Sequence, residues 1–150
     1  MITKDIERII HGVLKPKGYK KRGVTWYHHH PDVIHVLNLQ REFGTTYFLN
    51  AAIFIRALGN DEYPKEQHCH IRIRAEQIVM DGNLSRTLLH FEPDSSLDFE
   101  RAQAITLVIE KTAMWLQRLD TIAAVKREAI GNDEVLPRTI LKARKFLKLD

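Results

Sequence analysis

Residues 33–58 read VIHVLNLQREFGTTYFLNAAIFIRAL and decide the fold. This stretch contains two valines, three isoleucines, three phenylalanines and a tyrosine, which are residues that strands favour. Phe43-Gly44-Thr45 divides it, because glycine permits a chain reversal where the apolar run pauses. The sequence therefore predicts two antiparallel strands, at about 33–42 and 46–57, joined by a tight turn.

A further strand is predicted on each side of this pair. Before it, VTWYHHH predicts a strand at 24–30, and His30-Pro31-Asp32 predicts a tight turn into the next strand. After it, HCHIRIRAEQ predicts a strand at 68–77, which the chain reaches through a longer loop. We therefore expect a four-stranded antiparallel sheet, arranged as a meander, with one apolar face that other elements must cover.

Helical periodicity marks both ends of the chain. Apolar side chains recur at intervals of three and four up to Leu14, and Pro16 then ends the predicted helix. The same period predicts helices at 97–119, from Thr121 to Gly131, and from about Glu134 onward. The predicted fold class is therefore α+β: an N-terminal helix, the antiparallel sheet, and C-terminal helices packed on one face. We expect a single domain of residues 1–150.

The composition is that of a soluble globular protein. The chain has 150 residues, of which 44% are hydrophobic and 28% charged, with a formal net charge of +4. No apolar run approaches the ~18 residues that span a bilayer, and the first residues lack the apolar core of a secretory signal. Cys69 is the single cysteine, so no internal disulfide forms. We therefore expect a cytoplasmic protein without a membrane segment.

The stretch EQHCHIRIR, residues 66–74, carries the most distinctive polar pattern. On a strand, side chains alternate between faces, which splits this stretch into two rows. The polar row consists of His68, His70, Arg72 and Arg74. The other row begins with Cys69 and faces the core, where cysteine behaves as a small hydrophobe and not as a nucleophile. Arginine forks bind carboxylate and phosphate at two points, so the polar row predicts a surface for an anion or an acidic partner.

Neighbouring strands add polar side chains to this predicted surface. They are Asn38, Gln40, Asn50 and Arg56. Two interpretations stay open: these side chains fix the strand register, or they line a groove for a ligand or partner. Trp26 follows a basic run at residues 20–22 and is a candidate for stacking on nucleic acid, although no nucleic-acid motif accompanies it.

The histidines raise the question of a metal site. His68 and His70 are two apart on a predicted strand, and His28, His29, His30 and His35 are expected on nearby strands. Zinc sites use three or four ligands at recognised spacings, and neither HExxH nor paired CxxC motifs are present. The neighbouring arginines would also repel a cation. We therefore assign no metal ligand, no cofactor and no catalytic residue, and the absence of a catalytic motif argues against an enzyme.

Four segments form a combined pattern across the first half of the chain. They are KPKGYKKRGVTWY (15–27), VIHVLNLQRE (33–42), YFLNAAIF (47–54) and CHIRIR (69–74). Together they resemble a mainly bacterial family, the domain-of-unknown-function family 4304, over about residues 5–120. The resemblance implies an α+β fold and a recurring pattern at Gly18, Trp26, Asn38, Gln40 and Asn50. It implies no established activity and supplies no catalytic residues.

The leading hypothesis is a non-enzymatic binding module that engages a protein partner through its polar sheet face. An immunity-like inhibitor of a bacterial toxin is one instance, by analogy of architecture alone. The alternative is an anion-, nucleotide- or nucleic-acid-binding protein that uses the face lined by histidine and arginine. A metal-dependent enzyme is the third hypothesis.

Overall fold

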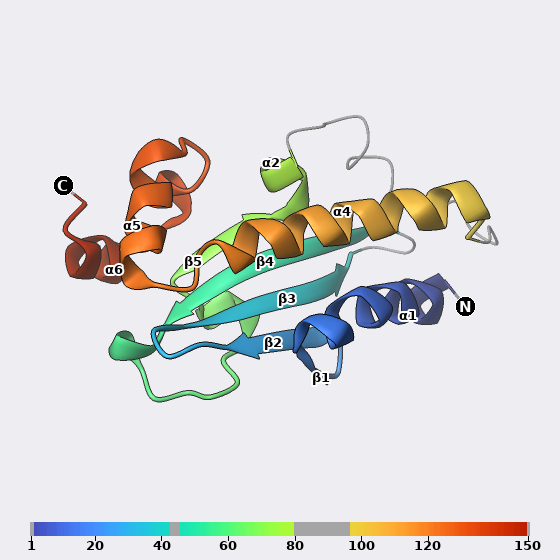
Figure 1. Cartoon of the computed structure of the whole chain (residues 1–150), viewed down its shortest axis with the longest axis horizontal. Coiled ribbons are helices and arrows are strands. Elements are labelled where there is room, and N and C mark those ends of the chain that lie inside the picture. The colour runs from blue at the N-terminus through green and yellow to red at the C-terminus, as the bar shows by residue number, and fades with distance from the viewer. Residues whose placement is uncertain (1, 43–45, 80–96, 150) are drawn as a thin grey trace.

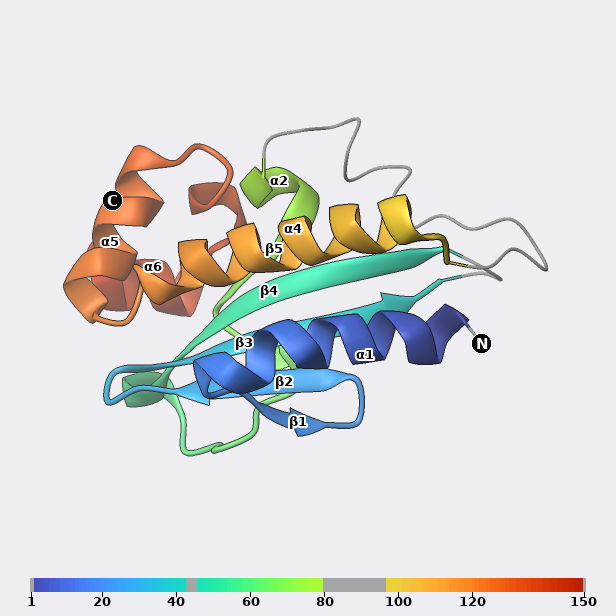
Figure 2. The ribbon, with the colours of Figure 1, turned by 45° about the vertical axis from the view of Figure 1, so that its right-hand side comes forward.

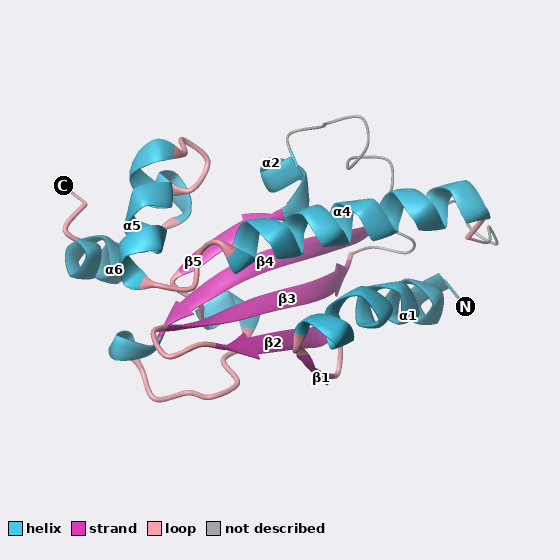
Figure 3. Ribbon diagram, viewed as in Figure 1, coloured by secondary structure: helices cyan, strands magenta, loops and turns pink. Residues whose placement is uncertain are grey.

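The computed structural model describes residues 2–42, 46–79 and 97–149. It consists of helices packed on an antiparallel sheet, which confirms the predicted α+β class (Figures 1 and 3). The strands are β1 (Lys20–Arg22), β2 (Thr25–His29), β3 (Val33–Arg41), β4 (Tyr47–Ile55) and β5 (Ile71–Arg74). The α-helices are α1 (Ile2–Leu14), α2 (Ala75–Val79), α4 (Phe99–Gln117), α5 (Ile122–Gly131) and α6 (Leu141–Leu147). Short 3-10 helices are η1 (Lys15–Lys17), η2 (Arg56–Leu58), η3 (Glu66–His68) and η4 (Leu136–Arg138).

The sheet has five strands in the order β1-β2-β3-β4-β5, one more than predicted. Every neighbouring pair is antiparallel, so the meander is confirmed, although the turn predicted at residues 43–45 lies outside the described residues. The additional strand β1 has only three residues, all basic and exposed, and therefore lacks the apolar alternation that predicts a strand. Gly23 begins the reversal into β2 with a φ of 61°, a left-handed value that glycine adopts without strain.

Helices α1 and α4 lie side by side over one face of the sheet (Figures 1 and 2). In α1, the buried side chains Ile6, Ile10 and Leu14 recur at four residues and form one stripe. Helix α4 begins after Asp98, whose carboxylate accepts a hydrogen bond from the Arg101 backbone amide at 2.8 Å. Among the described residues, no helix combines the length and apolar character that crossing a membrane requires.

The C-terminal segment packs against the same core, through buried residues of α5 and α6. Helix α5 ends at Gly131, as predicted, but the single helix predicted from Glu134 is divided into η4 and α6. Between them, Thr139 forms an isolated bridge with Ile71, and the Ile140 amide donates to the carbonyl of His70 at 3.0 Å. These contacts with the edge of β5 require extended backbone at residues 139 and 140, which interrupts the helix.

The opposite face of the sheet, here called the open face, carries a smaller apolar cluster, to which Tyr63 and Cys69 of the segment 56–70 contribute. Cys69 is buried in this cluster, which agrees with the predicted structural cysteine. It nevertheless lies on the opposite side of the sheet from Ile71 and Ile73, which belong to the helix-covered core. The predicted alternation fails here because β5 begins only at Ile71, and the preceding residues form η3.

Candidate functional site on the open face

A row of polar side chains crosses the open face at one level. Thr25, Asn38, Asn50 and Arg74 are successive cross-strand partners on β2, β3, β4 and β5. Gln40 lies two residues beyond Asn38 and therefore shares its face. Neighbouring strands are about 4.8 Å apart, so each side chain reaches the next. The register, which the sequence left open, thus brings four of the predicted site residues together.

The amides of this row bond to one another. Asn50 is buried, and its amide nitrogen donates to Gln40 Oε1 at 2.9 Å and to Asn38 Oδ1 at 3.4 Å. Asn38 in turn donates to Thr25 Oγ1 at 3.0 Å, and Gln40 donates to the carboxylate of Glu42. These bonds support the interpretation that the amides fix the register. They also hold the amides in set orientations next to Arg74.

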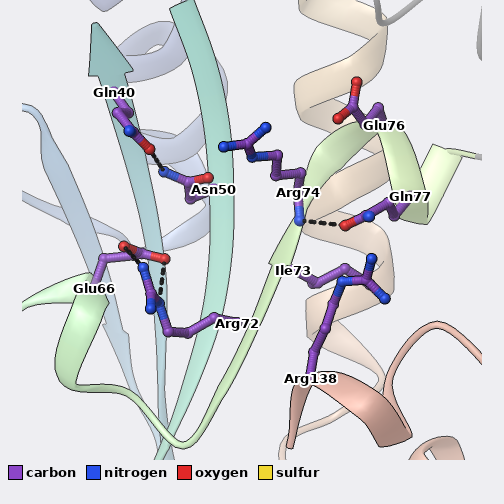
Figure 4. A pocket seen from close by; sticks show the side chains of 9 residues that line it. All are labelled: Gln40, Asn50, Glu66, Arg72, Ile73, Arg74, Glu76, Gln77 and Arg138. Atoms are coloured by element: carbon purple, nitrogen blue, oxygen red, sulfur yellow. Dashed lines mark hydrogen bonds and ion pairs between the residues drawn. The ribbon is translucent and has the colours of Figure 1, made fainter. Parts of the chain in front are cut away.

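Arg72 is neutralised by a neighbouring acid. Its Nε and one terminal nitrogen donate to the two carboxylate oxygens of Glu66 at 2.9 and 3.1 Å (Figure 4). These hydrogen bonds raise the pKa of Arg72, so its charge is retained and paired. Arg72 is therefore a weaker anion site than its sequence pattern predicts.

Arg74 is held differently. Its guanidinium carbon lies 3.8 Å from the centre of the Phe48 ring, a stacked cation–π arrangement. Its backbone amide donates to Gln77 Oε1 at 3.1 Å, which fixes the end of β5. Within the described ranges 2–42, 46–79 and 97–149, no acidic side chain forms an ion pair with Arg74. Its charge is consequently available to a ligand.

Arg72 and Arg74 both line a pocket of about 370 Å³. It is lined by Gln40, Asn50, Glu66, Arg72, Ile73, Arg74, Glu76, Gln77 and Arg138. Figure 4 shows Arg74 extending from β5 toward Asn50, with Arg138 entering from η4. Arg138 is paired with Glu134 at 3.0 Å. The pocket therefore offers hydrogen-bond donors and one cation that no described acid neutralises.

The two histidines of the EQHCHIRIR stretch do not line this pocket. His68 lies on η3, is exposed and is not part of a strand, which corrects the predicted row. His70 is buried, and its Nδ1 accepts a hydrogen bond from the Ile55 backbone amide at 2.8 Å. The ring of His70 also packs at 4.6 Å from that of Phe54. His70 therefore extends the pairing of β4 beyond the end of the strand.

Arg56 and Trp26 also lie away from the pocket. Arg56 follows β4 on η2, so it does not share a strand face with Asn50 as predicted. It donates to the carbonyl of His30 at 2.9 Å and pairs with Glu62 at 2.7 Å. Trp26 is fully buried in the helix-covered core, where its indole donates to His11 Nδ1 at 3.2 Å. Trp26 was a candidate for stacking on nucleic acid, and the structure instead packs its ring into the core.

Sequence reasoning missed the four other polar residues of the pocket. Glu66 and Arg138 lie on 3-10 helices, and Glu76 and Gln77 lie on the short helix α2. Neither strand alternation nor helical periodicity places residues in such short turns. One signal was present, because Glu66 stands just ahead of the arginine row in EQHCHIRIR.

Comparison with known proteins identifies the family of the chain and does not bear on the site. No curated protein and no solved structure matches the chain. One family matches over residues 10–118, from within α1 to the C-cap of α4, which confirms the resemblance drawn from the four segments. This match covers most of the chain, and the protein therefore belongs to the family described as Domain of unknown function (DUF4304).

Proposed function

We propose that the protein is a non-enzymatic binding protein whose open face receives an acidic side chain of a protein partner beside Arg74. The observation that supports the proposal is the environment of Arg74, stacked on Phe48 and, among the described residues, unpaired with any acid. Stacking orients the guanidinium fork without neutralising its charge. A carboxylate would meet a two-point donor that is already in place.

The amide network adds preorganisation to this donor. Asn50 is held by Gln40 and Asn38 through its own hydrogen bonds, so few side chains lose freedom when a partner arrives. Figure 4 shows Asn50 and Gln40 beside the Arg74 side chain. A partner would thus contact a rigid sheet surface, which lowers the entropic cost of association.

The acids around the pocket favour a single carboxylate over a polyanion. Glu66 and Glu76 line the pocket, and Glu42 bonds to Gln40 at its rim. A nucleic-acid backbone brings many phosphates, and like charges close to them weaken binding. One acidic side chain requires only one favourable position.

The proposal includes a reducing cytoplasmic setting, which fits the lone buried thiol of Cys69.

A second candidate is a small-anion or nucleotide site in the same pocket. The observation in its favour is the pocket volume of about 370 Å³, which falls within the usual range for small-molecule sites. Both candidates use Arg74, so the experiment must vary the ligand as well as the protein.

NMR titration of the ¹⁵N-labelled protein tests the proposal. The probes are a short peptide with two glutamates, the same peptide with glutamines, and inorganic phosphate. We expect saturable, salt-sensitive shifts at the Arg74 side-chain Nε–H and the Asn50 amide with the glutamate peptide only. Arg74→Gln should remove these shifts. Arg127→Gln removes the same charge from an exposed position on α5 and should leave them unchanged.

Each other outcome is informative. Equal shifts with the glutamine peptide, or equal loss in Arg127→Gln, contradict recognition of a carboxylate by Arg74. Saturation by phosphate at lower concentration than by the peptide selects the small-anion candidate.

A further inference from the structure

Three histidines of the β2–β3 hairpin converge on the helix-covered side of the sheet. His28 on β2 is the cross-strand partner of His35 on β3, and His30 follows β2 two residues after His28. The alternation of β2 places His28 and Trp26 on one face and His29 on the other. The His30 ring centre lies 4.4 Å from that of His28 and 4.5 Å from that of His35. This cluster is separate from the open-face pocket.

The ring nitrogens of the cluster lie close together. One nitrogen of each ring lies within 4.8 Å of those of the other two. His35 is fully buried, and its Nε2 lies 2.7 Å from the carbonyl oxygen of Leu119. A carbonyl only accepts, so Nε2 carries the proton and the lone pair of His35 is on Nδ1. A carbonyl that orients the distal nitrogen of a ligating histidine is a common outer contact of metal sites.

Two nitrogens of the cluster are buried without a hydrogen-bond partner among the described residues. They are Nδ1 of His35 and Nε2 of His30. Buried polar atoms are normally satisfied, because desolvation costs free energy that only a new partner returns. Two such atoms in one cluster indicate a shared partner that is not a protein atom.

The electrostatics of the cluster suit a cation. Burial favours the neutral form of each ring, since it lowers the pKa of His28 and His30 and lowers that of His35 to about 4. Neutral imidazole is the form that binds metals. Asp120 is close enough to oppose this lowering in His30 and His35, which places a negative charge near the cluster. Neither lysine nor arginine contributes to these three shifts.

We propose that His28, His30 and His35 form a binding site for a first-row transition metal ion of the Zn²⁺ type. An all-imidazole set favours zinc, copper or nickel over magnesium or calcium, which prefer oxygen. Three histidines leave a fourth position for water or the carboxylate of Asp120. Nitrogens that share one tetrahedral zinc lie roughly 3.3 Å apart, so modest ring rotation completes the site. His28 and His30 are only half-buried.

The ion also has a route to the site. His28 lines a surface pocket together with Gly18, Lys20, His29, Glu62 and Tyr63. Gly18 has a φ of 96°, and a Cβ at this position would lie 3.1 Å from His28 Nε2. Glycine here therefore leaves the imidazole of His28 uncrowded.

The test uses the untagged full chain, stripped with a chelator and titrated with ZnCl₂ in competition with a chromophoric indicator. We expect one Zn²⁺ to bind per chain. In His28→Gln or His30→Gln the affinity for Zn²⁺ should fall by more than about 100-fold, because losing a ligand costs more affinity than losing an outer contact usually does. Two matched controls are His29→Gln, on the other face of β2, and His68→Gln, on η3. Both should bind within twofold of the parent.

A second readout needs no substitution and so does not depend on how a variant folds. In ¹⁵N NMR spectra of the histidine rings, Zn²⁺ should shift Nδ1 of His35, while the rings of His68 and His70 should keep their positions. Absence of saturable binding overturns the proposal. Equal weakening in His29→Gln, or an unchanged His35 ring at saturation, overturns it as well.

Discussion

Glu66 holds Arg72 through both carboxylate oxygens, so the most exposed arginine of the pocket is already paired. Glu66→Gln should release this charge and strengthen binding of the glutamate peptide by about fivefold at low salt, the effect of roughly 1 kcal/mol between close charges in water. Stability should change by less than about 1 kcal/mol, because Arg72 is solvent-exposed. Peptide titration and urea denaturation measure the two quantities.

Glu62→Gln is the matched control for this change. Glu62 pairs with Arg56, outside the pocket, and its loss raises the net charge equally. Equal strengthening in both variants would mean that overall charge, and not the pocket, governs binding.

Asn50→Ala should lower the free energy of unfolding by about 1 kcal/mol, since Gln40 and Asn38 both lose a donor. The expected readout is a lower urea midpoint with an unchanged slope. If the amide row did not fix the sheet register, the midpoint would stay where it is in the parent protein.

His70→Ala and His68→Ala form a pair that separates the two histidines of EQHCHIRIR. His70→Ala leaves the buried amide of Ile55 without its acceptor and should cost about 2 kcal/mol or more. His68→Ala changes an exposed side chain on η3 and should fall within about 0.5 kcal/mol of the parent. Similar losses in the two variants would refute the assignment of His70 as a structural acceptor.

Acid should destabilise the metal-free protein through His35. Burial lowers the pKa of this ring to about 4 from 6.5, so between these values the unfolded chain binds more protons than the folded chain. The contribution of His35 to the free energy of unfolding is therefore fully present above pH 6.5. It is lost as the pH drops toward 4, by at most about 1.4 kcal/mol per pH unit. Urea denaturation with a chelator present measures the slope, and ring NMR shows which histidine titrates. Protonation of His35 near pH 6.5 in the folded state would contradict the buried neutral ring.

Much of the fold was predictable because apolar period and turn residues agree along the chain. Helices α1 and α4 each bury a stripe of side chains at helical spacing, which periodicity reports. Strands β3 and β4 are apolar runs that are buried almost throughout, and turn residues separate such runs in the sequence. Strand β1 has no apolar row, since its residues are basic and exposed. The division at Thr139 depends on a bridge to Ile71, a distant contact that local propensity does not encode.

The candidate site was predictable only in part, for the same reason. Alternation correctly put Asn38 and Gln40 on one face of β3, whereas their meeting with Asn50 and Arg74 depends on the register of β3, β4 and β5. Glu66 forms an ion pair with Arg72 from a turn whose geometry the sequence does not specify. Part of the histidine cluster could be predicted from the sequence, because a tight turn after His30 pairs His28 with His35 across the hairpin.

Affinity capture from the cells that produce the protein tests the central claim, that the open face binds an acidic partner through Arg74. The baits are the parent protein, Arg74→Gln and Arg127→Gln, and bound proteins are quantified by mass spectrometry. We predict a protein that the parent and Arg127→Gln retain in equal amounts and that Arg74→Gln loses by at least about tenfold, the equivalent of 1.4 kcal/mol. A partner retained equally by all three baits, or no partner retained by any of them, would contradict the account.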